Sequence, residues 1–305
     1  MIRKAFLLGA GLGTRLRPLT DRLPKPLVPL FHRPMVEWAA RACAGAGIEA
    51  FAVNTHHLPE AWTDPKWGLG DGPWLESPIR GGNGIPALAG SWQGCPVHLF
   101  HEPDLLETGG GIRNIAPWIG SDSVLVHNGD IFASLPLADL IAAHESSGNI
   151  ATLALRTAGT ARHIAHRDGK VVDIRGMLGR EQGTHVFSGI YVFSPGLLDF
   201  IAPGKTSVIP AFLELAKSGL LGAVVLDEGD WFDLGDPASY LSAHRDLHLA
   251  EMIHADARIS PDATIVGSAI GAGAEIGAGA EVIDSVVWPA AVVAAGERIE
   301  GVVRM

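Results

Sequence analysis

The sequence is poor in cysteine, with only Cys43 and Cys95 among 305 residues. Two thiols are too few for a disulfide framework or a cysteine-based zinc site, and their scarcity is typical of a reducing compartment. We therefore expect a cytoplasmic protein. The first eight residues faintly resemble a signal peptide, but the apolar run ends at Gly9 and charge returns at Arg15.

The sequence also lacks an excess of basic charge and a long apolar run. Acidic residues outnumber lysine and arginine by 33 to 23, which gives a formal net charge of −10. Such a chain lacks the basic face that binding to nucleic acid or to an anionic membrane requires. No stretch reaches the roughly 18 apolar residues of a membrane span. We therefore expect no nucleic-acid or membrane partner, and only local clusters of cations.

One such cluster lies in residues 7–30, where an apolar strand leads into a turn rich in glycine. The stretch contains the glycines Gly9, Gly11 and Gly13, and its cations include Arg15, Arg17 and Lys25. Glycine lets a ligand approach the backbone closely. Exposed amides supply partial positive charge, and arginine binds phosphate through two parallel hydrogen bonds. This stretch therefore predicts a site for a nucleoside triphosphate.

Two familiar glycine-rich motifs do not fit this stretch. The dinucleotide-binding fingerprint needs glycine where Thr14 stands, and an acidic residue ending a second strand about 20 residues later. Glu37 falls instead within a helical pattern. A P-loop needs a lysine directly after Gly13, which is absent. Both an NAD-binding site and a P-loop are excluded.

Three short segments of the same stretch carry a resemblance to a known family. They are Gly-Thr-Arg-Leu at residues 13–16, Pro-Leu-Thr at 18–20 and Pro-Lys-Pro-Leu at 24–27. On these segments the chain resembles the sugar-1-phosphate nucleotidyltransferases, over about residues 1–248. The resemblance implies a Mg²⁺-dependent transfer of a nucleotidyl group from UTP or GTP to a sugar 1-phosphate, giving an NDP-sugar and pyrophosphate.

The hydrophobic pattern predicts an α/β fold. Helical periodicity follows Pro34 until Gly45 and Gly47, and an apolar strand follows at residues 51–53. This is a βαβ unit, whose parallel strands place their carboxyl ends and their ligands on one edge. We expect a Rossmann-like mixed sheet flanked by helices, of the GT-A-like nucleotidyltransferase type. Residues 62–95 show no clear period and predict an inserted lid or partner surface, or a long loop held by buried tryptophans.

Two aspartates are candidate ligands of Mg²⁺. The apolar strand at residues 124–127 ends in Asn128-Gly129-Asp130, and a carboxylate at the carboxyl end of a central parallel strand points toward the phosphate loop. Carboxylate oxygens suit Mg²⁺, which shares them with substrate phosphates. The resemblance assigns Asp233 as the second ligand. Asp236 stands where the family has threonine.

The resemblance assigns the remaining site residues. The glycine run at residues 106–112 opens a helix predicted at 112–119 and matches a segment that lines the base and the sugar. Expected nucleotide ligands are Gly9, Ala10, Gly11, Gly13, Thr14, Arg15, Glu102, Thr108 and Gly109. Expected sugar-phosphate ligands are Lys25, Asn128, Arg175, Ser188 and Gly189. Arg175 would replace a Glu-Lys-Pro segment that this chain lacks. The expected catalytic residues are Arg15, Lys25 and Asp130.

The last fifty residues have a different pattern. From Ile259 onward, apolar residues recur about every sixth position, among them Ile265, Ile276 and Val282. This hexapeptide repeat is typical of a left-handed parallel β-helix. We expect a catalytic domain at residues 1–250 and a short β-helix at 251–305. So few coils must stack on the catalytic domain or on a second subunit, and the latter would make a homo-oligomer.

The sequence leaves the base and the sugar open. Residues 106–112 and 184–190 look most like the N-acetylmuramate-1-phosphate uridylyltransferases of cell-wall recycling, which we favour. The C-terminal repeat, His101-Glu102 and Trp288-Pro289 look more like mannose-1-phosphate guanylyltransferases. A non-catalytic regulatory relative is the alternative from another class. The joint presence of the two cations and two aspartates named above argues against it, because a sensor needs no metal-bridged phosphate.

Overall fold

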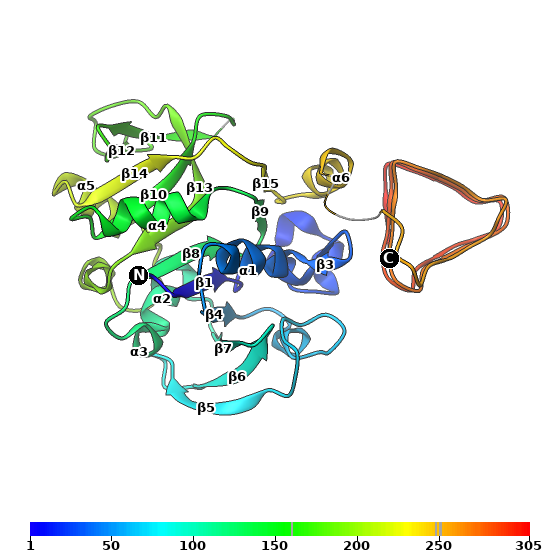
Figure 1. Cartoon of the computed structure of the whole chain (residues 1–305), viewed down its shortest axis with the longest axis horizontal. Helices are drawn as coiled ribbons and strands as arrows, with labels where there is room; N and C mark the ends of the chain where they lie inside the picture. Colours follow the sequence, from blue (N-terminus) through cyan, green and yellow to red (C-terminus); the bar gives the residue numbers. More distant parts are fainter. Residues whose placement is uncertain (160, 248, 250–251) are drawn as a thin grey trace.

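The computed structural model describes residues 1–159, 161–247, 249 and 252–305. Within them, one mixed sheet has the strand order β10-β14-β12-β11-β13-β8-β1-β4-β7-β6-β5 (Figure 1). The strands are β1 Lys4–Leu8, β4 Ala50–Thr55, β5 Leu75–Arg80, β6 Pro86–Trp92, β7 Cys95–His101, β8 Val124–Asn128, β10 Ala151–Arg156, β11 Arg162–Arg167, β12 Lys170–Ile174, β13 His185–Phe193 and β14 Leu221–Val225. The helices are α1 Met35–Gly45, α2 Glu107–Asn114, α3 Ala116–Ile119, α4 Leu137–Glu145, α5 Ile209–Lys217 and α6 Pro237–Asp246.

The centre of the sheet is parallel, as the βαβ pattern predicts. Strand β1 pairs in parallel with β4 and with β8, and β4 pairs in parallel with β7. The apolar side chains of these strands are buried, which explains their nearly continuous hydrophobic sequence. In this register Leu8 lies opposite Asn128, so the strand ends that lead into the glycine turn and into Asp130 are neighbours.

The other half of the sheet contains antiparallel strands. Strand β13 pairs with β8 and with β10, and the register with β10 shifts opposite Gly189, which has φ +78°. A glycine inside a strand commonly marks such a bulge. Strands β11 and β12 pair antiparallel and are joined by a tight turn. Asp168 and Gly169 both have positive φ, as a type I′ turn requires.

Two predictions of local structure were wrong. Residues 62–95 are not a long loop or a separate lid, because β5 and β6 form a hairpin that extends the sheet from β7. The sequence of β5 does not show the usual alternation of buried apolar and exposed polar residues, because Leu75 is 66% exposed while Ser77 is buried. The helix predicted at residues 112–119 begins earlier, at Glu107, so the glycine run lies inside α2. The predicted helix is also divided in two, because α2 ends at Asn114 and α3 begins at Ala116, next to Pro117, which has no amide hydrogen to donate.

The C-terminal segment forms three short parallel sheets, β16-β19-β22, β17-β20-β23 and β18-β21-β24. The strands are β16 Arg258–Ile259, β17 Thr264–Val266, β18 Ala269–Ile270, β19 Glu275–Ile276, β20 Glu281–Ile283, β21 Val286–Val287, β22 Val292–Val293, β23 Arg298–Glu300 and β24 Val303–Arg304. Viewed end on, the chain traces a triangle (Figure 1). The predicted domain boundary at 250/251 lies outside the described residues.

The coil packs against the α/β domain. The indole Nε1 of Trp288 donates to the hydroxyl of Tyr240 at 3.2 Å, and that hydroxyl donates to the carbonyl of Pro29 at 2.5 Å. All three lie in or beside one continuous apolar cluster that includes Val287 and Leu27. Among the described residues, no helix is both long enough and apolar enough to cross a membrane.

Candidate active site

A cleft of about 510 Å³ opens at the carboxyl ends of β1 and β8. This is the edge at which a parallel sheet is expected to bind its ligand. The predicted site residues that line it are Ala10, Gly11, Gly13, Thr14, Arg15, Lys25, Thr108, Asn128 and Asp130. Residues far apart in the sequence therefore meet at the predicted place.

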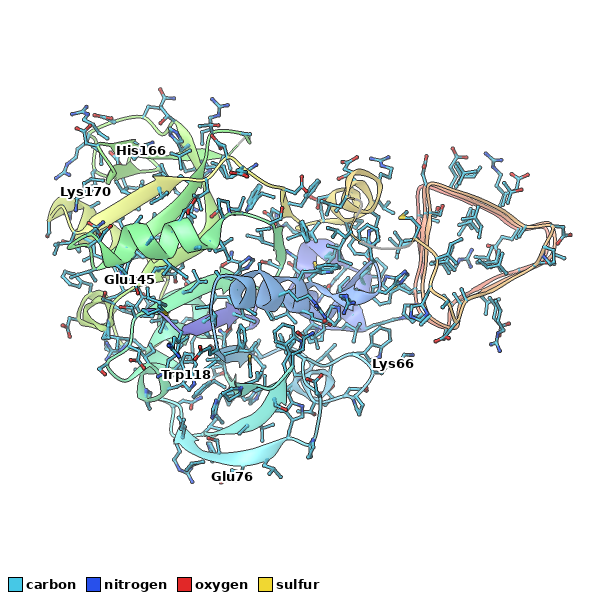
Figure 2. All side chains as sticks on the ribbon, in the orientation of Figure 1. Lys66, Glu76, Trp118, Glu145, His166 and Lys170 are labelled. Atoms are coloured by element: carbon cyan, nitrogen blue, oxygen red, sulfur yellow. The ribbon has the colours of Figure 1, made fainter. Side chains whose placement is uncertain are left out.

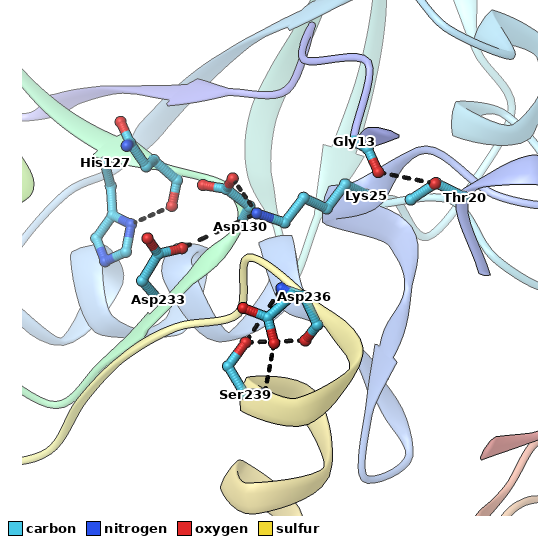
Figure 3. A network of polar contacts seen from close by, with 9 residues as sticks. Gly13, Thr20, Lys25, His127, Asp130, Asp233, Asp236 and Ser239 are labelled. Atoms are coloured by element: carbon cyan, nitrogen blue, oxygen red, sulfur yellow. Dashed lines mark hydrogen bonds and ion pairs between the residues drawn. The ribbon is translucent and has the colours of Figure 1, made fainter. Parts of the chain in front are cut away.

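At the wall of the cleft, Lys25 joins two carboxylates (Figure 3). Its Nζ lies 2.6 Å from Oδ2 of Asp130 and 4.0 Å from Oδ1 of Asp233. Asp233 ends strand β15 (Trp231–Asp233), which pairs antiparallel with β9 (Ile131–Ala133) and places Asp233 opposite Ile131. Lys25 is almost fully buried, so the carboxylates compensate its charge. The sequence places Lys25 among the phosphate ligands, whereas in the structure its ammonium contacts the two candidate metal ligands.

The charged groups near Asp233 change its pKa. Burial raises the pKa of Asp233 above its usual value, Lys25 and Arg15 oppose the rise, and the neighbouring Asp130 adds to it. A Cβ placed on Gly235 would lie 3.1 Å from Nη2 of Arg15 and 3.3 Å from Oδ1 of Asp233. The glycine therefore leaves the space in which the guanidinium lies beside the carboxylates.

The three glycines of the turn serve three different purposes. Gly13 has φ +61°, a left-handed conformation that favours glycine, and its carbonyl accepts from the hydroxyl of Thr20 at 2.9 Å. A Cβ on Gly11 would meet nothing within 4 Å, so this residue faces open space. A Cβ on Gly9 would lie 2.6 Å from the carbonyl oxygen of Asn54. Gly9 thus packs against the interior, which corrects its assignment as a nucleotide ligand.

A buried network of hydrogen bonds holds the glycine turn in place. Oε1 of Glu102 accepts from Nδ2 of Asn54 at 2.8 Å, and Oδ1 of Asn54 accepts from the amide of Gly9 at 2.8 Å. Oε2 of Glu102 accepts from the amide of Leu106 at 3.0 Å. Burial raises the pKa of Glu102, and these hydrogen bonds oppose the rise. Glu102 is fully buried and positions two loops, so its assignment as a direct nucleotide ligand was wrong. No sequence motif points to Asn54, which joins Gly9 to Glu102.

Replacing Asn54 with alanine should lower the free energy of unfolding by about 2–4 kcal/mol, because a buried amide and a buried carboxylate oxygen lose their partner. Urea denaturation measures this. Asn83→Ala is the matched control, since its exposed side chain also makes two kinds of hydrogen bond and should cost about 1 kcal/mol or less. Equal losses in the two variants would contradict the role of Asn54.

The glycine run in α2 serves packing. The amides of Gly109 and Gly110 donate to the carbonyl of Thr206 at 2.8 and 3.0 Å, and a Cβ on Gly109 would lie 2.9 Å from the carbonyl oxygen of Ser207. Gly109 therefore allows close contact between α2 and a neighbouring loop, and it does not line the cleft. Thr108 does line it, while its hydroxyl oxygen accepts from the amide of Val208 at 2.9 Å.

Glu107 is a cleft residue that the sequence analysis missed. It is exposed, lines the cleft and has φ +61°, which is uncommon for a residue with a side chain. Backbone strain of this kind is found mostly at functional sites. The clue in the sequence was a charged residue two positions before a glycine run.

The strain at Glu107 predicts that Glu107→Gly will be more stable than Glu107→Ala by about 1 kcal/mol, because only glycine adopts positive φ at little cost. Both variants remove the carboxylate, so their difference isolates the backbone. Urea midpoints measure it. An alanine variant as stable as the glycine variant would show that the backbone is relaxed.

Gly189 packs against Asn128, which lines the cleft. A Cβ on Gly189 would lie 2.8 Å from Nδ2 of Asn128. Ser188 is fully buried, and its hydroxyl donates to the carbonyl of Ala154 at 2.8 Å. Its own carbonyl accepts from Nε1 of Trp231 at 2.9 Å, which holds β15 in place. Ser188 was therefore wrong as a sugar-phosphate ligand, because successive side chains of a strand face opposite sides.

Arg175 also lies away from the cleft. It is an exposed residue in the turn after β12, its φ is +56°, and it is not among the residues that line the cleft. Its backbone amide donates to the carbonyl of His163 at 2.6 Å. The hairpin that carries Arg175 extends the sheet, and a role for Arg175 in place of the missing Glu-Lys-Pro segment stays a prediction.

The unusual Asp236 has a local explanation. Its carboxylate accepts from the amide of Ser239 at 2.9 Å and the hydroxyl oxygen of Ser239 accepts from the amide of Asp236, a capping box that begins α6 (Figure 3). The capping box therefore explains Asp236 without a role in metal binding. Among the described residues there is no group of three or more histidine, cysteine or acidic side chains that could hold a metal ion. Asp130 and Asp233 are two carboxylates that share the contact with Lys25.

Comparisons with known proteins agree with this geometry. Residues 4–249 match the family described as Nucleotidyl transferase. The chain is 28% identical to a UTP–glucose-1-phosphate uridylyltransferase of Synechocystis sp., covering 79% of this chain and 62% of that protein. It is 30% identical to a mannose-1-phosphate guanylyltransferase of Mycobacterium tuberculosis, covering 80% and 64%. The chain thus spans less than two thirds of the length of these relatives.

A solved structure has a similar fold. The UTP-bound UGPase from Acinetobacter baumannii superimposes with a TM-score of 0.61 at 20% identity, covering 80% of this chain and 92% of that one. At this identity the likeness concerns the fold.

Proposed function

The chain belongs to the nucleotidyl transferase family, and from that premise we propose that it transfers a nucleotidyl group from a nucleoside triphosphate to a sugar 1-phosphate and releases pyrophosphate. The observation that carries the proposal is the cluster of Lys25, Asp130 and Asp233 at the wall of a glycine-lined cleft, with Arg15 beside it. A triphosphate needs this combination of free amides, cations and paired carboxylates.

The reaction joins an oxygen of the sugar phosphate to the α-phosphorus while the bond to pyrophosphate breaks. The transition state is loose, so positioning and charge neutralisation matter more than proton transfer. In this proposal, Arg15 binds the departing pyrophosphate through its fork of N–H groups. Lys25 holds the two carboxylates in place and supplies a fixed positive charge at the cleft wall.

The carboxylate pair also fits a divalent cation. Asp130 and Asp233 both lie within 4.0 Å of the Lys25 ammonium, and their proximity contributes to the raised pKa of Asp233, so the site favours additional positive charge. We propose that these two residues hold Mg²⁺. Bound there, Mg²⁺ would neutralise charge on the substrate phosphates.

For the base and sugar we propose GTP and mannose 1-phosphate first. The Mycobacterium tuberculosis relative and the C-terminal coil support this choice, and it revises our preference for the uridylyltransferase. The exposed carboxylate of Glu107 in the cleft also supports it, because a carboxylate only accepts hydrogen bonds. Guanine offers adjacent donors on its pairing edge, whereas uracil offers one donor between two carbonyls. UTP with N-acetylmuramate 1-phosphate is the second candidate, supported by the sequence of residues 106–112.

A pyrophosphate-release assay tests these proposals. The protein is mixed with Mg²⁺, each of the four nucleoside triphosphates and a panel of sugar 1-phosphates, and we expect the highest kcat/KM with GTP and mannose 1-phosphate. A preference for UTP and N-acetylmuramate 1-phosphate would favour the second candidate. Absence of pyrophosphate with every pair would contradict catalysis and favour a regulatory relative.

We further propose that the C-terminal coil is a left-handed parallel β-helix of hexapeptide repeats that forms a domain of its own at residues 251–305 and mediates homo-oligomer formation. The buried side chains of Ile276, Val282 and Val293 inside the coil support the repeat. We propose a cytoplasmic location on the basis of the low cysteine content.

A further inference from the structure

Two histidines on neighbouring strands lie close together outside the active-site cleft. His166 lies on β11 and His185 begins β13, and the two strands pair antiparallel with Ile164 opposite His185. Successive side chains of a strand alternate between its faces, so the two histidines share one face of the sheet. Figure 2 shows His166 at the outer hairpin of the α/β domain, on the side remote from the C-terminal coil. Neither histidine lines the cleft.

The distance between the two imidazoles suits a bound metal ion. Nε2 of His166 lies 3.4 Å from Nε2 of His185. This exceeds the length of most protein hydrogen bonds, which is about 2.7–3.2 Å. A tetrahedral Zn²⁺ ion binds each imidazole nitrogen at about 2.0–2.1 Å, which places two such nitrogens about 3.3–3.4 Å apart. The pair therefore has the spacing of two ligands of one ion.

The surroundings of each ring leave its Nε2 available to an ion. Nδ1 of His185 lies 2.8 Å from the hydroxyl oxygen of Thr184, and a ring that donates from Nδ1 carries its lone pair on Nε2. Nδ1 of His166 is buried without a hydrogen-bond partner in the described part of the chain, so this ring interacts through Nε2. Burial lowers the pKa of His166, and His185 adds to the effect, which favours the neutral form that binds metal ions.

The charges around the pair are compatible with a bound cation. Hydrogen bonds from Thr157 lower the pKa of Asp227, which keeps this carboxylate ionised. Arg156 and His185 lower it further, so the negative charge of Asp227 lies near the histidines. The positive charge of Arg167, which follows one of the histidines in the chain, is compensated by an ion pair. Both imidazoles are partly exposed, so an ion from solution can reach them.

We propose that His166 and His185 bind a divalent transition-metal ion of the Zn²⁺ class and that this ion fastens β11 to β13. Imidazole nitrogen suits Zn²⁺, whereas the aspartates of the cleft suit Mg²⁺, so the two sites differ in the ion they prefer. Water completes the coordination, and binding is therefore reversible. The register of β11 and β13 shifts between Arg162 and Ile164, so the ion adds a link where strand pairing is irregular. The proposal does not depend on catalytic activity.

Calorimetric titration of Zn²⁺ into the full chain tests the proposal, with Mg²⁺ in excess to occupy the carboxylates of the cleft. His166→Asn and His185→Asn should each lower the affinity for Zn²⁺ at least tenfold. The double variant should lose little more than either single variant, because one ion needs both rings. His163→Asn is the matched control and should stay within twofold of the parent, since His163 is an exposed histidine of β11 on the opposite face of the strand.

Thermal unfolding gives a second measurement. The unfolded chain does not hold the two rings together, so Zn²⁺ should raise the unfolding midpoint of the parent and of His163→Asn but not of the other two single variants. Equal Zn²⁺ affinity in the parent and in those two variants would overturn the proposal and leave the pair as a contact within the protein. Binding lost in Asp130→Asn but kept in the histidine variants would place the ion in the cleft and overturn it as well. Midpoints without metal that match the parent show that the variants are folded.

Discussion

Replacing Lys25 with alanine is expected to lower kcat at least a hundredfold. Its ammonium lies 2.6 Å from Asp130 and 4.0 Å from Asp233, and almost no solvent reaches it. Without it, two carboxylates face one another at the wall of a cleft that must accept a polyanion. Loss of one strong, preorganised charge contact typically costs about 10²–10³ in kcat. Pyrophosphate release at saturating substrates measures the effect.

Arg17→Ala is the matched control for this experiment. Arg17 belongs to the same cationic stretch, but its guanidinium is exposed and paired with Asp21 at 3.2 Å. Exposed ion pairs contribute little, so kcat should remain within about twofold of the parent. Near-normal turnover in Lys25→Ala would refute the assignment. Equal losses in both variants would mean that the effect comes from the stretch as a whole and is not specific to the buried ammonium.

Asp130→Asn is expected to lower kcat by a hundredfold or more and to weaken binding of a divalent cation by at least tenfold. Asparagine keeps the size of the side chain but removes the negative charge that pairs with Lys25 and that we propose binds the cation. Mn²⁺ as a spectroscopic substitute, titrated into the free protein and followed by electron paramagnetic resonance, reports cation affinity independently of turnover.

Asp122→Asn serves as the control for this variant, because Asp122 is an exposed carboxylate paired with Lys4 at 2.7 Å and does not line the cleft. Both its turnover and its Mn²⁺ affinity should match the parent. If Asp130→Asn loses turnover while its Mn²⁺ affinity is unchanged, Asp130 acts by holding Lys25, and the metal assignment is wrong. Retention of turnover would contradict both roles.

The part of the site that could be predicted from the sequence is the part built from local spacing. A strand, a turn that needs Gly13 in a left-handed conformation and a short path to Lys25 all lie in residues 5–25. Asp130 could be placed for the same reason, because it directly follows an apolar strand and the carboxyl ends of parallel strands share an edge. The hexapeptide spacing likewise predicted the short strands of the coil.

Errors arose where a residue has a different neighbour from the one its position suggests. Gly9 and Gly109 match a ligand-binding motif, yet each allows a close contact with the backbone of another segment. Glu102 and Ser188 are polar residues in matching positions, yet both are fully buried and hydrogen-bonded within the protein. A polar or glycine residue looks the same in sequence whether its partner is a ligand or another segment of the chain.

The sequence by itself determined the parallel βαβ core and the identity of the charged groups, because hydrophobic period and turn chemistry are local properties. Only the tertiary structure decided how those groups combine. Pairing of β15 with β9 brings Asp233 beside Asp130, and the ammonium of Lys25 then lies between them because two crowded carboxylates require a cation. That pairing joins strands far apart in the chain, and no local pattern records it.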